Sequence, residues 1–236
     1  MACNTSPHCV TLNEPEHRQR IKRTREHAEK YLHRNPKKHA AEMELIERSF
    51  AALPRRPRTV LDAPCGVGRA AIFLAKKGYD STGIDLGDAA VEIAREQVRR
   101  EGLQLAIDHG DLLALPYDDG QFDAVLCFRL LHHLPTAEYR GEIIKALCRV
   151  SNDFILISYL SPYSFTSIKR RIRHRLTGKK IVQNTTALNE IKGHFAANGF
   201  TFVQNFIQGG AIPVQKIIHS GVPFVHSLNL AVFSKR

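Results

Sequence analysis

The segment Val60–Ala71 constrains the fold more than any other part of the sequence. It reads as an apolar strand, a tight turn that contains Gly66 and Gly68, and an alanine-rich helix start. Glycines in such a turn let the backbone approach a ligand closely at the carboxyl end of the first strand. The segment therefore predicts a β-α unit whose turn borders a binding crevice.

Alternating strand and helix patterns follow this unit along the chain. Strands are predicted at 59–63, 81–85, 105–108, 122–128, 154–159, 201–204 and 227–233, and helices at 40–53, 69–77, 88–101, 137–150, 165–176 and 188–198. Repeated β-α units with apolar strands indicate a parallel sheet covered on both faces. No helical pattern occurs at 208–223, so we expect the last strand to be antiparallel. The predicted fold class is α/β, with a seven-stranded, mostly parallel, doubly wound (Rossmann-like) sheet.

The positive charge of the chain, +11 overall, is concentrated in two segments. Residues 1–40 carry nine Lys/Arg and four Glu, and residues 164–188 carry seven Lys/Arg and no acid, which leaves the rest close to neutral. We predict a basic N-terminal arm at 1–38 with one short helix, a single domain at 39–236, and a basic insertion at about 160–185. Such patches favour an anionic partner: nucleic acid, phospholipid or a phosphorylated small molecule.

Cysteine usage and hydropathy bear on the compartment. The five cysteines form neither an even set nor a C-x-x-C pair, which favours a reduced compartment. The N-terminus lacks a secretion signal, and no run of about eighteen apolar residues occurs. We expect a soluble, cytoplasmic protein, with contact at the inner face of a membrane left open.

The glycine turn fits two classes of nucleotide-binding protein. Gly66-x-Gly68-x-x-Ala71 matches the dinucleotide pattern, and Asp85 ends the second strand where a ribose-binding acid would lie. Asp62, however, precedes the turn, where a carboxylate would repel a pyrophosphate but attract a ligand with ammonium and sulfonium groups. Asp62 therefore favours a ligand with ammonium and sulfonium groups over a dinucleotide.

A further acid, in Gly110-Asp111-Leu112, follows the third strand and could accept a hydrogen bond from an adenine amino group. The order of these segments resembles the class I S-adenosylmethionine-dependent methyltransferases, especially their small-molecule and quinone-methylating branch, over roughly residues 40–236. The resemblance implies S-adenosyl-L-methionine as the cofactor. The implied donor site comprises Asp62, Ala63, Gly66, Gly68, Asp85, Leu86, Asp111, Leu112 and the backbone around Phe128.

The resemblance also implies a role for each part of that site. Asp62 and the two glycines would surround the methionine portion, and Asp85 would hold the ribose hydroxyls. Leu86 would pack on adenine, while Asp111 and the Leu112 amide would read the adenine edge. The family's usual first glycine is replaced by Pro64, so the turn must begin without a left-handed residue there. The plainer alternative is that these are ordinary strand-end and turn residues that bind nothing.

The loop after the fourth strand, Phe128–Pro135, should border the methyl acceptor. His132 or His133 could act as a general base there if the acceptor loses a proton. Alternatively, one imidazole packs in the core and the other is solvated. Adjacent histidines point apart and no carboxylate follows at ligand spacing, so we predict no metal site.

Candidate acceptor-binding residues are cationic or lie in the arm: Tyr31, Arg129, Lys169, Arg170 and Arg173. Within the insertion, Phe165, Ile168, Ile172 and Leu176 form one stripe of a helix whose other faces are almost wholly cationic. Such a helix could lie on an anionic membrane, cap the acceptor pocket, or simply pack its stripe on the domain.

The predicted activity is methyl transfer to an oxygen or carbon of a small, anionic or amphipathic acceptor, such as a quinone precursor, a lipid or a lipopolysaccharide-type saccharide. An RNA methyltransferase is the main alternative, although the chain lacks the Asn/Asp-Pro-Pro-aromatic run of enzymes that methylate amines on bases. A nicotinamide-dependent oxidoreductase and a non-catalytic donor-binding regulator are further alternatives. Oligomeric state is left open.

Overall fold

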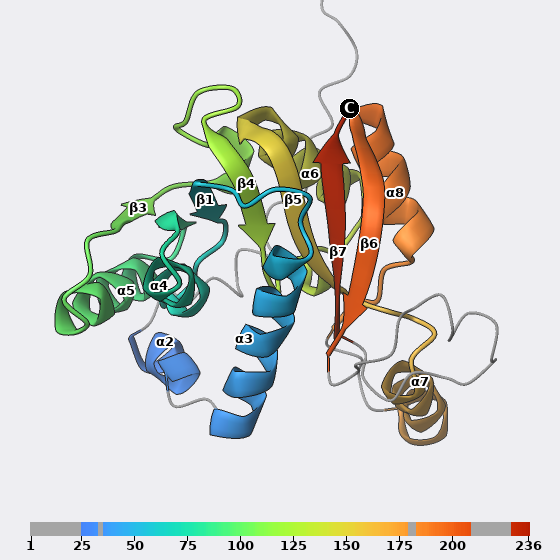
Figure 1. Cartoon of the computed structure of the whole chain (residues 1–236). Helices are drawn as coiled ribbons and strands as arrows, with labels where there is room; N and C mark the ends of the chain where they lie inside the picture. Colours follow the sequence, from blue (N-terminus) through green and yellow to red (C-terminus); the bar gives the residue numbers. More distant parts are fainter. Residues whose placement is uncertain (1–24, 33–34, 179–182, 209–227) are drawn as a thin grey trace, which may run out of the picture.

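A computed structural model describes residues 25–32, 35–178, 183–208 and 228–236. Seven strands form one sheet in the order β3-β2-β1-β4-β5-β7-β6 (Figure 1). The strands are β1 Thr59–Asp62, β2 Asp80–Asp85, β3 Ala106–His109, β4 Phe122–Cys127, β5 Ser151–Leu160, β6 Phe200–Ile207 and β7 Leu228–Lys235. β1 to β5 pair in parallel, whereas β7 is antiparallel to both β5 and β6. The predicted fold class is confirmed, including the antiparallel last strand.

Helices flank the sheet on both faces. They are α2 Arg25–Leu32, α3 Pro36–Ala51, α4 Arg69–Lys76, α5 Asp88–Arg100, α6 Ala137–Val150, α7 Phe165–Thr177 and α8 Leu188–Ala197. Two 3-10 turns, η1 Leu112–Ala114 and η2 Leu131–His133, lie in the loops after β3 and β4. In Figure 1, α3 stands in front of the sheet and α6 lies behind it.

The start of α3 differs from the prediction. The helix begins at Pro36 rather than near residue 40, so it crosses the expected boundary between arm and domain at 38/39. Asn35 caps it, because its side chain accepts hydrogen bonds from the backbone N–H groups of Lys37 and Lys38. Proline at the first helical position loses no intrahelical hydrogen bond and has a suitable φ, so Pro36 starts this helix instead of breaking the chain.

Strand β5 also begins earlier than predicted, at Ser151 rather than Phe154. It follows α6 directly, and Ser151 already pairs with Phe122 of β4. The polar start is stable because the Ser151 hydroxyl donates to the carbonyl of Phe154 at 2.9 Å. The hydropathy pattern missed this extension because the first three residues of β5 are polar.

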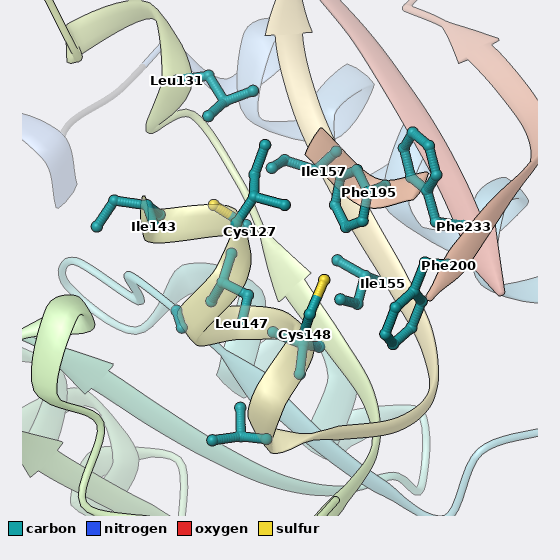
Figure 2. Close-up of a cluster of buried hydrophobic side chains, with 14 of the residues drawn as sticks. Cys127, Leu131, Ile143, Leu147, Cys148, Ile155, Ile157, Phe195, Phe200 and Phe233 are labelled. Carbon is teal, nitrogen blue, oxygen red and sulfur yellow. The ribbon is translucent and has the colours of Figure 1, made fainter. Parts of the chain in front are cut away.

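Alternate residues of the central strands pack into different hydrophobic layers. Val125, Ile155 and Ile157 face α6 and α8, where Phe195 stacks on Phe233 with ring centroids 3.8 Å apart (Figure 2). On the opposite face the intervening residues of β4, β5 and β7 pack against α3 and α4. This period of two on both faces is the signature of a sheet buried between helix layers.

The predicted short helix of the arm is α2, and it packs on the domain. Ala28 is fully buried in a cluster with Val67 of the glycine turn and with Ile93 of α5. Arg25 also pairs with Glu96 of α5 at 2.9 Å. The described part of the arm therefore supports the glycine turn from outside.

Among the described residues, no helix combines the length and the apolar character that crossing a membrane requires. Cys65, Cys127 and Cys148 are buried thiols without disulfides. Cys3 and Cys9 lie outside the described residues.

Candidate functional site at the carboxyl edge of the sheet

The glycine turn connects β1 to α4 with two residues in the left-handed region. Gly66 has φ 57° and Gly68 has φ 79°, and the Ala63–Pro64 peptide bond is cis. A Cβ on Gly68 would lie only 3.1 Å from the Cβ of Ala94. Pro64 thus leaves both left-handed positions to glycine, as the sequence required.

Asp62 lies beneath this turn and is almost completely buried. Its Oδ2 accepts the backbone N–H of Ala71 at 3.0 Å. That N–H lies in the first turn of α4, where amides have no partner within the helix, and the N-cap residue Gly68 has no side chain to provide one. Asp62 therefore caps α4 from the preceding strand.

Asp85 joins the glycine turn to the end of β2. Its two carboxylate oxygens accept the backbone N–H groups of Gly66 and Gly87, both at 2.8 Å. The turn is further closed by the Cys65 N–H, which donates to the carbonyl of Ile84 at 2.8 Å. A carboxylate accepts about four hydrogen bonds, so Asp85 retains capacity for about two more, such as those from hydroxyl groups.

Asp111 follows β3 on the same edge. It caps η1, and its Oδ1 accepts the Leu113 N–H at 3.0 Å. Leu112 packs against the core from this loop. The strand register aligns Asp62 with Gly83 and Asp85 with His109, so the acids that end β1 and β2 and the Asp111 loop occupy adjacent positions along the edge.

The loop after β4 completes this edge. Phe128 is buried, and Arg129 has the left-handed φ of 64°, the one described non-glycine residue with positive φ. The Arg129 N–H donates to the Ser158 hydroxyl at 2.6 Å, which helps to hold this backbone conformation. His132 is buried and His133 is half-buried, and their ring centroids are 4.1 Å apart, so the expectation that the two imidazoles point apart is wrong.

A buried carboxylate that the sequence pattern did not single out connects this loop to α3. Glu42 has 1% of its side chain exposed and lies 2.9 Å from a guanidinium nitrogen of Arg129 and 3.2 Å from one of Arg69. Glu42 precedes Ile46 and Phe50 at helical spacings of four, so it belongs to the face that packs on the sheet. An acid on the apolar face of this helix is therefore the feature of the sequence that indicates a buried ion pair.

Cys127 is the last residue of β4, and its thiol is fully buried. Burial, and to a smaller extent the charge of Asp62, raises the pKa of this thiol far above its usual value. Cys127 is therefore a neutral packing residue and not a nucleophile.

The remaining predicted acceptor residues lie on α7 and α2. On α7, Lys169 and Arg173 are exposed and Arg170 is half-buried. This helix follows the carboxyl end of β5 (Figure 1), but no hydrogen bond or ion pair joins its cations to the glycine turn among the described residues. Tyr31 belongs to α2, but its side chain lies outside the described part of the structure.

A cavity of about 360 Å³ lies elsewhere, between the C-terminal ends of α3 and α4. Phe50, Phe73 and Tyr79 line it, together with Arg56 and Lys77. These residues adjoin the starts of β1 and β2, the edge opposite to the glycine turn. The cavity is therefore separate from the candidate site.

Comparison with known proteins matches residues 60–153 to the family described as "Methyltransferase domain". Ajmaline N-methyltransferase of Rauvolfia serpentina is 36% identical over 120 residues, which cover 48% of this chain and 40% of that protein. Norajmaline N-methyltransferase of the same organism is 34% identical over 140 residues, covering 55% and 46%. The chain thus spans less than half the length of these curated relatives.

Solved structures extend the similarity to most of the chain. Magnesium protoporphyrin IX methyltransferase from Synechocystis PCC 6803, with bound SAH, has a TM-score of 0.66 and 17% identity, and the match covers 84% of each chain. At that identity the similarity concerns the fold. The chain therefore has the fold of the class I S-adenosylmethionine-dependent methyltransferases, and its residues 60–153 match the methyltransferase-domain family.

Proposed function

We propose that the protein transfers a methyl group from S-adenosylmethionine to a small-molecule acceptor. The observation that carries the proposal is Asp85, which holds the amides of Gly66 and Gly87 on the edge where Asp62 and Asp111 also lie. Two features of the comparisons support it: the relatives are named methyltransferases, and the similar fold was solved with bound SAH.

The donor would be held by charge and by backbone contacts. The spare acceptor capacity of Asp85 suits the two ribose hydroxyls, with Leu86 against adenine and Asp111 at the adenine amino group. Asp62, close to the methionine portion, favours a ligand that carries ammonium and sulfonium charges and disfavours a pyrophosphate. The left-handed glycines, together with Ala63, Leu112 and the backbone of Phe128, would let the donor approach the main chain closely.

When bound, the donor supplies a methyl group activated by the positive sulfur. The chain must then align the acceptor with that methyl group and exclude water. Of the two histidines, His133 is the more exposed and is our candidate general base for an acceptor that loses a proton. His132 has only 1% of its surface exposed and is therefore the less accessible of the two.

We propose an anionic or amphipathic small molecule as the acceptor, with Arg129 and the α7 cations on its side of the site. The relatives are named N-methyltransferases, so nitrogen joins oxygen and carbon as a candidate acceptor atom. The protein can be incubated with S-adenosylmethionine labelled in its methyl group and, separately, with metabolite, lipid and RNA extracts. The extract that becomes labelled identifies the class of acceptor. Labelling of RNA alone would contradict the proposal of a small-molecule acceptor.

Calorimetric titration of the protein with S-adenosylmethionine, S-adenosylhomocysteine and NADH tests the donor. We expect binding of both adenosyl ligands and none of NADH. Binding of NADH alone would identify the glycine turn as a dinucleotide site and refute the proposal. Adenosyl binding without labelling of any extract would instead support a donor-binding regulator.

Two matched variants test the placement of the ribose. Asp85→Asn should weaken S-adenosylhomocysteine binding about tenfold or more, because a hydrogen bond to a charged group contributes about 1.5–3 kcal/mol. Asp119→Asn makes the same chemical change at a largely exposed carboxylate and should bind as the unmodified protein does. Equal affinities of the two variants would show that Asp85 does not hold the donor.

The two histidines can be separated in the same way. For an acceptor that loses a proton, His133→Gln should lower kcat while donor affinity stays unchanged, because the imidazole acts only in the transfer step. His132→Gln should instead lower the free energy of unfolding, since it alters a buried side chain. Full turnover in the folded His133→Gln protein would exclude this residue as the base.

A further inference from the structure

Helix α7 is anchored to the domain by its first turn. Ser164 caps the helix by accepting the Ser167 N–H, and both hydroxyls donate to the carbonyl of Ser161 at the end of β5. All three serines are buried, whereas every residue from Arg171 to Gly178 is exposed. The helix is therefore held at one end and projects from the body of the protein.

Three residues of the α7 stripe face away from this anchor, whereas the fourth, Ile168, is half-buried. At about 100° per residue, Phe165, Ile172 and Leu176 lie about 140–180° around the helix from the buried Ser167. Their exposed fractions are 52%, 53% and 80%. The alternative in which the stripe merely packs on the domain is thus not what the structure shows for these three residues.

Cations accompany this exposed stripe without carboxylate partners. The helix carries Lys169, Arg170, Arg171, Arg173 and Arg175, and no acid occurs between Asp153 and Glu190. Within the described residues none of the five forms an ion pair, and Arg171 donates only to the carbonyl of Pro162. Lys169 and Arg173 flank the stripe on the outward side.

We propose that α7 binds the surface of a bilayer that contains anionic phospholipids. In this arrangement Phe165, Ile172 and Leu176 enter the boundary between headgroups and acyl chains, and the flanking Lys169 and Arg173 reach the lipid phosphates. A helix with an apolar stripe and a cationic remainder matches both properties of that surface. An RNA strand would match the charge but would leave the aliphatic side chains of Ile172 and Leu176 in water.

The orientation of the protein on the membrane follows from the connection of α7 to β5. The helix follows the carboxyl end of β5 (Figure 1), and β5 pairs with β4, which in turn pairs with β1. Docking by α7 would therefore turn the edge with the glycine turn toward the membrane. The binding itself does not depend on the proposed methyl transfer, and its test uses no enzymatic readout.

The chain contains no tryptophan, which allows a site-specific fluorescent probe. Ile172→Trp places the sole tryptophan on the α7 stripe, and Val203→Trp places it on β6 at a residue with 42% exposure. Both proteins are titrated with phosphatidylcholine vesicles and with mixed phosphatidylcholine and phosphatidylglycerol vesicles. We expect the emission of Ile172→Trp to shift to shorter wavelength only with the anionic vesicles, and that of Val203→Trp to stay constant.

Charge variants made in the Ile172→Trp protein complete the experiment. Changing Lys169, Arg173 and Arg175 to Gln should raise the lipid concentration for half-maximal shift about tenfold or more. Changing the exposed cations Arg99, Arg100 and Lys145 to Gln removes the same charge from α5 and α6 and should leave that concentration unchanged.

Three outcomes would overturn the inference. One is the absence of a shift with anionic vesicles, and another is an equal loss of binding in both charge variants. The third is a shift on addition of polyuridylic acid with none on addition of vesicles, which would make α7 a nucleic-acid surface. Circular dichroism of each variant verifies that the protein is folded.

Discussion

The carboxylate of Glu42 on α3 lies 2.9 Å from the guanidinium of Arg129, a residue 87 positions later in the loop after β4. The same carboxylate reaches Arg69 at the start of α4. Arg69 places a positive charge at the positive end of a helix, which is unfavourable without a counter-ion. One buried acid thus joins α3, α4 and the loop after β4.

Replacing Glu42 should destabilise the protein strongly. Glu42→Gln leaves two arginines without their buried counter-ion, so we expect the free energy of unfolding to fall by about 3 kcal/mol in urea denaturation. Glu44→Gln removes an acid that is 66% exposed and 3.7 Å from Arg48, and it should cost less than about 1 kcal/mol. Similar midpoints for the two variants would mean that burial adds nothing to this ion pair.

Alanine at Gly68 should be destabilising for two separable reasons. Its φ of 79° strains any side chain, and the new Cβ would press on Ala94 at 3.1 Å. Gly102 has a similar φ of 63° but open space around it, so Gly102→Ala measures strain alone. We expect a loss of about 1–2 kcal/mol for Gly102→Ala and a larger loss for Gly68→Ala. Thermal unfolding of both variants measures which loses more stability. Equal losses would show that the contact with Ala94 adds no destabilisation.

Gly193→Ala should have the opposite effect. Gly193 lies within α8, and a Cβ there would meet no atom within 4 Å. Alanine reduces the entropy of the unfolded chain and suits a helix, so the free energy of unfolding should rise by about 0.5–1 kcal/mol. A lower melting temperature for this variant would contradict the conformation of α8 at this residue.

Asp123 should contribute stability that depends on pH. Partial burial alone would raise the pKa of its carboxyl, but the N–H groups of Arg58 and Thr59, with the charge of Arg55, outweigh burial and lower the pKa. The unfolded chain then binds the proton more tightly, so this contribution is present above the unfolded pKa of about 4 and is lost as pH falls through the lower folded value.

Asp123→Asn should therefore reduce the free energy of unfolding at pH 7 and flatten its decline between about pH 5 and pH 3. Urea denaturation across that range measures both quantities. Asp118→Asn, at an exposed carboxylate on the loop before β4, serves as the control. A slope for Asp123→Asn as steep as that of the unmodified protein would assign the pH dependence to other groups.

The sheet could be predicted from the sequence because apolar strands and glycine turns are local patterns. The antiparallel β7 followed from the lack of a helical pattern in its connection. The start of α3 differs from the predicted residue 40 because the cap by Asn35 makes Pro36 a first helical residue, whereas the apolar spacing marks only the later turns. The acids at the strand ends were placed correctly on one edge, since parallel strands align their carboxyl ends there.

Other features of the edge depend on contacts between distant segments. The link from Glu42 to Arg129 joins α3 to the loop after β4, and no local pattern specifies such a pair. Likewise, hydropathy identifies the stripe through Ile172 and Leu176 but not whether other elements cover it. Exposure of that stripe is a property of the assembled domain.

The two hydrogen bonds of Asp85 have a consequence for the thermodynamics of binding. Because Gly66 and Gly87 are already held by its carboxylate, their conformational entropy is lost when the protein folds and not when a ligand arrives. A ligand at this edge therefore meets a preorganised backbone, and more of its interaction energy is retained as affinity.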